Sequence, residues 1–159
     1  MNRGLSVRDL TPEQLARCAP GSVLLELARR QPRRDLEHAE QVKLFTWARQ
    51  HEREVPALRL LYAIPNFSGR GFSSRVRQRD GARLKAEGRK QGMLDICLPV
   101  ARGSFHGLYM ELKVPGGHPT KEQRRWSAAL RAEGYRAEIV IGWEGARDLI
   151  RDYVATPRV

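Results

Sequence analysis

Four residues of this chain have the types and the spacing that phosphodiester hydrolysis requires. Asp95 is followed sixteen positions later by Glu111, Lys113 lies two residues beyond it, and Gln123 comes soon after. Carboxylate oxygens are the ligands that Mg²⁺ and Mn²⁺ prefer, so a fold that joins the two acids could bind either ion. A bound ion polarises a phosphate and activates water. The lysine can then offset charge that develops on the phosphate.

A predicted β-hairpin brings these residues together. Leu94–Val100 and Gly107–Val114 have the composition of strands, and a turn containing Gly103 and Ser104 separates them. Side chains alternate along a strand, so Glu111 and Lys113 share one face of the second strand while Leu108, Met110, Leu112 and Val114 turn to the core. Pairing in register would place Asp95 opposite Glu111 near one end of the sheet.

The remaining segments predict one α/β domain with a central mixed sheet flanked by helices. Thr120 is typical of a helix N-cap with Gln123 three residues on, in the turn that can face the hairpin. Helices are also expected at Asp35–His51, Val76–Glu87 and Trp143–Tyr153, and strands at Leu60–Ile64 and Ala137–Ile141. We expect residues 1–34 to form a helical appendage and residues 35–159 to form the domain.

Positive charge favours nucleic acid as the partner. The 159 residues contain 29 Lys and Arg against 18 Asp and Glu, a net charge of +11. Such an excess attracts phosphates because bound counterions are released. Between Phe67 and Met93 there are eight basic residues and two acidic ones. The predicted DNA-binding residues are Arg70, Arg75, Arg77, Arg79, Arg83, Lys85, Arg89 and Lys90. Phe67 and Phe72 in the same stretch are candidates for base stacking.

The composition excludes several other classes of protein. Cys18 and Cys97 are far apart, which argues against a zinc site or a disulfide framework and favours a reducing cytoplasm. We expect Cys97 to be a small buried residue and not a nucleophile. There is no apolar run long enough for a transmembrane helix and no secretory signal, so no membrane association is expected. The four histidines show no ligand spacing.

Several segments together resemble the virus-type replication-repair nuclease (VRR-NUC) domain of the PD-(D/E)XK nuclease superfamily, in its stand-alone phage and prophage form. The resemblance extends over about residues 35–153 and leaves residues 1–34 uncovered. The segments that carry it are Glu37–Gln41, Ala63–Asn66, Ala82–Gly88, Gly92–Asp95, Gly107–Lys113, Thr120–Gln123 and Gly134–Tyr135. Leu94 departs from the pattern, since a proline often precedes the aspartate, and this changes backbone shape without removing a ligand.

The resemblance implies a PD-(D/E)XK restriction-endonuclease-like fold and a role for each motif residue. Asp95 and Glu111 would bind Mg²⁺ or Mn²⁺, with the backbone carbonyl of Leu112 as a third ligand. Lys113 would be the catalytic lysine, and Gln123 matches the glutamine of the helix that follows the lysine strand.

The family also has a glutamate in its first helix, for which this chain offers two residues. The Glu-x-x-x-Gln spacing to Gln41 selects Glu37. Glu40 is a close rival, because residues three apart lie on the same side of a helix.

We therefore expect a divalent-metal-dependent DNA endonuclease that selects branched DNA, such as four-way junctions or flaps, by structure. A branched substrate has two equivalent strands, which makes a homodimer the expected form. Three alternatives stay open: a sequence-specific restriction-type or packaging nuclease, a nucleic-acid-binding module without catalysis on the same fold, and a structural phage protein.

Overall fold

The computed structural model describes residues 33–65 and 83–158 of the chain. Of the expected appendage, residues 1–32 lie outside the described residues, whereas its last two residues begin helix α3. The basic residues Arg70, Arg75, Arg77 and Arg79, with Phe67 and Phe72, also lie outside them. The described helices are α3 (Arg33–His51), the short 3₁₀ helix η2 (Pro56–Leu60), α5 (Lys121–Ala132) and α6 (Gly142–Ala155). The strands are β1 (Tyr62–Ala63), β2 (Ile96–Leu98), β3 (Leu108–Lys113) and β4 (Arg136–Ile141).

One four-stranded mixed sheet organises the described residues, with the order β1-β2-β3-β4. The hairpin expected from the sequence is present, because β2 pairs antiparallel with β3 and Ile96 lies opposite Met110. On its other edge, β2 pairs antiparallel with β1. After β3 the chain passes through α5 and returns as β4, which pairs parallel with β3. The α/β architecture with a central mixed sheet is therefore confirmed.

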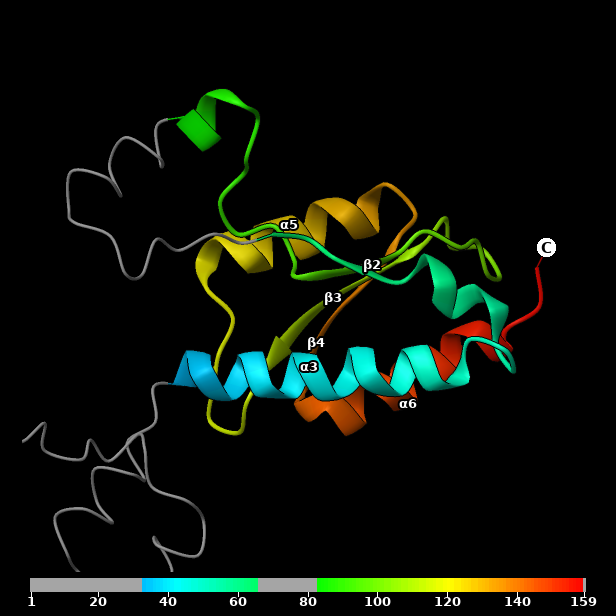
Figure 1. Cartoon of the computed structure of the whole chain (residues 1–159). Coiled ribbons are helices and arrows are strands. Elements are labelled where there is room, and N and C mark those ends of the chain that lie inside the picture. Colours follow the sequence, from blue (N-terminus) through cyan, green and yellow to red (C-terminus); the bar gives the residue numbers. More distant parts are fainter. Residues whose placement is uncertain (1–32, 66–82, 159) are drawn as a thin grey trace, which may run out of the picture.

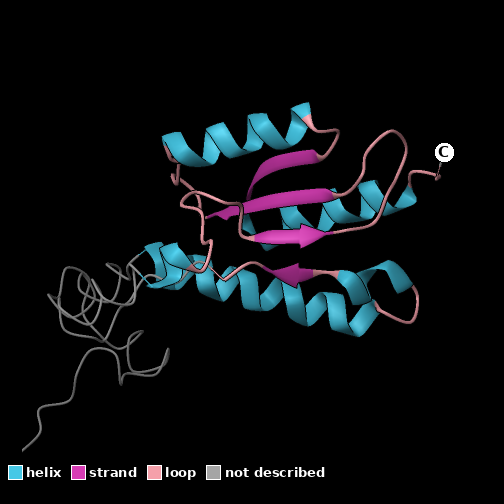
Figure 2. Cartoon of the chain, turned by 90° about the horizontal axis from the view of Figure 1, so that it is seen from above, coloured by secondary structure: helices cyan, strands magenta, loops and turns pink. Residues whose placement is uncertain are grey.

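Helices cover both faces of this sheet (Figures 1 and 2). On one face, α3 and α6 pack side by side against the apolar side chains of β2 and β3. This cluster contains the fully buried residues Leu44, Leu58, Ile96, Leu98, Leu108, Met110 and Ile150. On the other face, α5 covers a smaller cluster built from Leu94, Leu130 and Ala137. Burial on both faces means that the strand face with Glu111 and Lys113 is also interior.

The ends of two predicted strands differ from the structure. Only Ile96–Leu98 of the segment Leu94–Val100 pairs as a strand. In the segment Leu60–Ile64, only Tyr62–Ala63 pairs, since Pro56 begins a 3₁₀ helix that extends to Leu60. Short apolar runs do not reveal how far they pair, because the length of a ladder depends on its partner strand. Of the predicted basic helix, the described part is helical up to Ala86 and turns at Gly88.

Glu40 ties α3 to α6. Its Oε2 atom accepts a hydrogen bond of 2.9 Å from the backbone N–H of Trp143, in the first turn of α6. Its Oε1 atom accepts one of 2.6 Å from Nζ of Lys43. The Lys43 hydrogen bond, with that from Trp143, lowers the pKa of Glu40 below its ordinary value. The residue before α6, Ile141, has no side chain that can cap the helix. Glu40, which is far away in the sequence, therefore accepts from one of the free N–H groups at the start of α6.

Removing this carboxylate should loosen the contact between the two helices. We expect Glu40→Ala to lower the free energy of unfolding by about 1 kcal/mol at pH 7, as for the loss of a helix cap. Glu40→Gln keeps an acceptor for Trp143 but loses the charge. Since the folded pKa lies below 4.5, the charge stabilises the protein above that pH and its contribution disappears as the pH falls through the folded pKa. Denaturant unfolding from pH 3 to pH 7 measures the difference between wild type and Glu40→Gln.

Glu144→Gln is the matched control, because Glu144 lies in the same first turn of α6. It should change stability by less than about 0.5 kcal/mol. A difference between wild type and Glu40→Gln that is the same at pH 3 and pH 7 would contradict this role of Glu40.

Candidate active site

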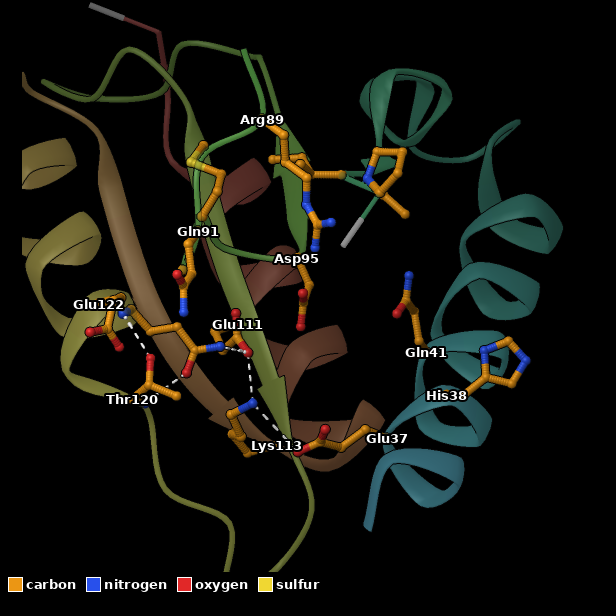
Figure 3. A pocket seen from close by; sticks show the side chains of 16 residues that line it. Glu37, His38, Gln41, Arg89, Gln91, Asp95, Glu111, Lys113, Thr120 and Glu122 are labelled. Atoms are coloured by element: carbon orange, nitrogen blue, oxygen red, sulfur yellow. Dashed lines mark hydrogen bonds and ion pairs between the residues drawn. The ribbon is translucent and has the colours of Figure 1, made fainter. Parts of the chain in front are cut away.

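A cavity of about 820 Å³ opens between the N-terminal half of α3, the end of the hairpin and the start of α5. Figure 3 shows side chains from all three regions pointing into it. Its polar lining residues are Glu37, His38, Gln41, Arg89, Gln91, Asp95, Glu111, Lys113, Thr120, Glu122 and Gln123. Every described residue that the sequence analysis placed in the catalytic set lines this cavity, with the exceptions of Glu40 and Leu112.

Asp95 and Glu111 meet across the hairpin as the alternation argument predicts. The β2–β3 register pairs Ile96 with Met110, and one further step along the ladder places Asp95 opposite Glu111. Both carboxylates point into the cavity (Figure 3). Burial, followed by the charge of Asp95, raises the pKa of Glu111 to about 8, although Lys113 acts in the opposite direction. Two carboxyl groups buried this close together disfavour the charged form of Glu111, and a bound cation would reverse that preference.

The two oxygens of the Glu111 carboxylate differ in their hydrogen bonds. The residue is only 1% exposed. Its Oε1 atom accepts hydrogen bonds from Nζ of Lys113, at 2.7 Å, and from Nε2 of Gln123. Its Oε2 atom is buried and has no hydrogen-bond partner within the described part of the chain. A buried carboxylate oxygen without a donor is costly, and a cation beside it removes that cost.

These residues fit a divalent cation of the Mg²⁺ type. Mg²⁺ is usually held by one or two carboxylates and completes its shell with water and substrate phosphate. Asp95 and Glu111 supply such a pair, with the Oε2 atom of Glu111 available as a ligand. Within residues 33–65 and 83–158, no group of three His, Cys, Asp or Glu side chains is arranged to hold a metal ion. The expected third ligand, the carbonyl of Leu112, stays a prediction.

Lys113 lies between two glutamates. It is 8% exposed. Its Nζ atom is 2.7 Å from Oε1 of Glu111 and 3.5 Å from Oε1 of Glu37. Burial alone would lower the pKa of Lys113, but the hydrogen bond to Glu111 and the charges of the neighbouring acids reverse this and raise it. The ammonium group is therefore a fixed positive charge in the cavity and not a general base.

Gln123 is positioned by the way that α5 begins. The hydroxyl of Thr120 accepts from the backbone N–H of Gln123 at 3.1 Å, while the Gln123 side-chain oxygen accepts from the backbone N–H of Thr120 at 2.8 Å. This is the capping box that the sequence predicts. Because its oxygen is engaged in the cap, the side-chain amide group of Gln123 must direct its N–H toward Glu111.

The two candidate glutamates of α3 lie in different places. Glu37 lines the cavity and approaches Lys113, as Figure 3 shows. Glu40 is absent from the cavity lining and binds the first turn of α6 instead. The sequence favoured Glu37 by its spacing to Gln41 but left Glu40 as a rival, because residues three apart share a side of the helix and the position of α6 is set by tertiary packing.

Two cavity residues of α3 were not predicted as part of the site. Gln41 lies one turn after Glu37, and the Glu-x-x-x-Gln spacing was the signal that could have placed it there. His38 also lines the cavity, although its spacing to the other histidines gave no reason to select it.

The basic residues of the described segment have different environments. Arg89 lines the cavity and extends into it (Figure 3). Lys85 and Lys90 are exposed. Arg83 is paired with Glu87, with Nε 2.8 Å from Oε1, which leaves less of its charge for a ligand. Among the described members of the predicted DNA-binding set, Arg89 is therefore the one that lines the same cavity as the carboxylates.

Comparison with known proteins identifies the fold. No family model and no curated protein matches the sequence. A solved structure described as a "VRR_NUC domain protein" is similar to 77% of this chain and 90% of its own, with 24% sequence identity and a TM-score of 0.63. The chain has a VRR_NUC fold. The predicted α/β fold of the PD-(D/E)XK type is thus confirmed, and the resemblance to VRR-NUC domains holds at the level of the fold.

Gly92 sets the distance between the hairpin and α5 in this VRR_NUC fold. It has a φ of +80°, and a Cβ atom added to it would lie 2.4 Å from Cβ and 2.8 Å from the backbone carbon of Glu122. The neighbouring residue along α5 is Gln123, whose backbone nitrogen would be 3.0 Å away. Any side chain here must therefore displace the start of α5, the helix whose Gln123 side chain hydrogen-bonds to Glu111.

We expect Gly92→Ala to lower the free energy of unfolding by roughly 2–4 kcal/mol, from backbone strain together with the collision against α5. Gly88→Ala is the matched control, because Gly88 also has a positive φ, +93°, but its added Cβ would meet nothing within 4 Å. Urea denaturation of both variants separates the two effects. Equal losses in the two variants would contradict the close packing of Gly92 against α5.

Proposed function

We propose that this protein is a divalent-metal-dependent DNA endonuclease that hydrolyses phosphodiesters in branched DNA. The observation that carries the proposal is the buried carboxylate of Glu111. One of its oxygens is fixed by Lys113 and Gln123, and the other is buried without a donor in the lining of a cavity that Asp95 also lines. The VRR_NUC fold supports the proposal, since nuclease chemistry is what the name of the similar structure denotes.

A purely structural role would not explain this arrangement. Two acidic side chains on adjacent strands repel one another, and burying them with an unsatisfied oxygen costs stability. Apolar residues of similar volume would serve the core at this position better. Groups whose environment shifts their pKa strongly cluster at functional sites, and Glu111 lines a cavity that is large enough for a ligand.

Each residue would have a distinct part in hydrolysis. Asp95 and Glu111 would hold Mg²⁺ or Mn²⁺, which when bound polarises the scissile phosphate and lowers the pKa of water. Lys113 places its ammonium group beside them and would stabilise negative charge that accumulates on the phosphate oxygens in the transition state. Glu37 and Glu111 hold that ammonium in place from opposite sides, while Gln123 keeps the carboxylate of Glu111 oriented.

Several features support DNA as the substrate. The net charge of +11 favours polyanions, and Arg89 brings a guanidinium group, a good partner for phosphate, into the same cavity as the carboxylates. Basic contacts to the backbone hold DNA without reading its sequence, which agrees with selection by structure. We further propose that the protein acts as a homodimer on both strands of a four-way junction. Its place of action would be the cytoplasm of a bacterium or of a phage-infected host. No helix in the described ranges is long and apolar enough to cross a membrane.

Cleavage assays on duplex, flap, splayed-arm and four-way junction DNA test the proposal. The protein should cut branched DNA in Mg²⁺ or Mn²⁺ and not in EDTA. Lys113→Met and Asp95→Asn should each lower the rate at saturating metal by at least about 100-fold, because each removes a charge used in the transition state. Single-turnover gel assays with end-labelled substrates measure these rates.

Lys121→Met is the matched control, because Lys121 lies at the exposed beginning of α5 and outside the cavity lining. Full activity of Lys113→Met and Asp95→Asn, or cutting in EDTA, would contradict the mechanism. Tight DNA binding without cutting in either metal would favour the non-catalytic binding module, and cutting at one sequence irrespective of DNA shape would favour a restriction-type enzyme.

Glu37 and Glu40 can be assigned by a paired substitution. Since Glu37 is 3.5 Å from the Lys113 ammonium and Glu40 binds α6, Glu37→Gln should lower the cleavage rate by roughly 10-fold or more with little change in stability. Glu40→Gln should do the reverse. Cleavage rates and thermal unfolding of both variants, measured on the same preparations, decide the matter. A larger loss of activity in Glu40→Gln would overturn the assignment.

A further inference from the structure

A second cavity of about 470 Å³ lies beside the candidate active site. The two cavities share the lining residues Ile64, Pro65, Arg89 and Met93, so they are two compartments of one depression. Leu84 and Trp126 add further apolar surface to the second cavity, and Lys90 adds a second basic residue. None of the catalytic residues proposed above lines the second cavity.

Helix α5 connects the two compartments. It presents Gln123 to the first cavity and Trp126, three residues later, to the second. Residues three apart on a helix are neighbours, with about 5–6 Å between their Cβ atoms. A group in the second cavity therefore lies next to a group held at the carboxylates, at a separation suited to adjacent parts of one ligand.

The indole of Trp126 is held in a fixed orientation. Its Nε1–H donates to the backbone oxygen of Gln91 at 3.0 Å, and this contact joins α5 to the segment that contains Gly92. Trp126 is half-buried, so part of the ring is covered and part is available at the cavity. A fixed aromatic ring loses little conformational entropy when it binds a ligand.

The chemistry of this lining matches a nucleotide. Aromatic and apolar walls bind the face of any base by stacking, independent of sequence. Arg89 and Lys90 line the same cavity and are complementary to the phosphates on either side of that base. Glu87 also lines it, with its carboxylate paired to Arg83. A volume of 470 Å³ lies within the range of sites that hold small organic ligands.

We propose that the second cavity binds one unpaired nucleobase of the DNA substrate, adjacent to the phosphate that is held at Asp95 and Glu111. The inference rests on the proposed function, because it takes the first cavity as the place of the scissile phosphate. A paired base inside a duplex cannot enter such a cavity without being extruded. Among branched substrates, the cavity would therefore favour those with an unpaired nucleotide beside the cut, such as flaps, over fully paired four-way junctions, by structure and not by sequence.

Binding of wild-type protein to DNA with single abasic positions tests the inference without any substitution. Fluorescein-labelled flap DNA is prepared with an abasic analogue at one position at a time around the branch, and the dissociation constant is measured by anisotropy in EDTA. Binding should weaken by about 10-fold when one particular unpaired base next to the branch is missing, which is the size of one stacking contact. Equal affinity for every abasic substrate would overturn the inference.

Variants at Trp126 connect the effect to the cavity. Trp126→Leu should bind the intact and the sensitive abasic flap with the same affinity, while Trp126→Phe should retain part of the difference because it keeps an aromatic face. Trp143→Leu is the control, since Trp143 lines neither cavity and contacts Arg147 instead. It should keep the full 10-fold preference. A full preference in Trp126→Leu would overturn the inference, and circular dichroism of each variant confirms that it is folded.

The inference and the proposed function fail in different ways. A base-dependent affinity that Trp126→Leu removes supports the second cavity even if no cleavage is found, because the measurement is made in EDTA. Conversely, metal-dependent cleavage of flaps whose affinity is unaffected by abasic positions keeps the proposed function and removes the nucleobase site.

Discussion

The site depends on one buried ion pair, the contact between Glu111 and Lys113 in the interior of the sheet. A charge taken out of water must be compensated, and here the compensation is partial: one carboxylate oxygen is satisfied and the other is left without a donor. Three neighbouring elements contribute residues around this pair. The capping box of α5 directs Gln123 to the satisfied oxygen and α3 brings Glu37 to the lysine. The register of the hairpin places Asp95 opposite Glu111.

The buried position of this pair follows from the helices that cover both faces of the sheet and enclose its apolar clusters. On one side α3 and α6 enclose an apolar cluster that holds the strands rigid. On the other side α5 lies close to the hairpin, and the absence of a side chain at Gly92 permits that approach. A rigid scaffold keeps functional groups within a narrow range of geometries. The same packing leaves Trp126 at the edge of α5, where a second cavity adjoins the first.

Much of this could be predicted from local sequence signals. Three predicted features are present: the hairpin, the capped helix that begins after Thr120, and the alternation that turns Met110 to the apolar core and Glu111 to the other face. They follow from residue alternation and capping patterns that extend over only a few residues. The lengths of β1 and β2 could not be predicted, since they depend on pairing with distant strands. The spacing to Gln41 favoured Glu37 but could not exclude Glu40, because only the position of α6 shows where the Glu40 side chain is bound. The second cavity is formed by segments that are far apart in the chain, and no local pattern indicates it.

We propose that Asp95 and the unsatisfied oxygen of Glu111 together bind one divalent cation. An anomalous difference map from crystals grown with Mn²⁺, collected at the manganese edge, tests this directly. The account predicts a peak in the first cavity within about 2–2.5 Å of both carboxylates, with Lys113 still bound to the other oxygen of Glu111. A map with manganese bound elsewhere, or with none between these two residues at saturating Mn²⁺, would contradict it.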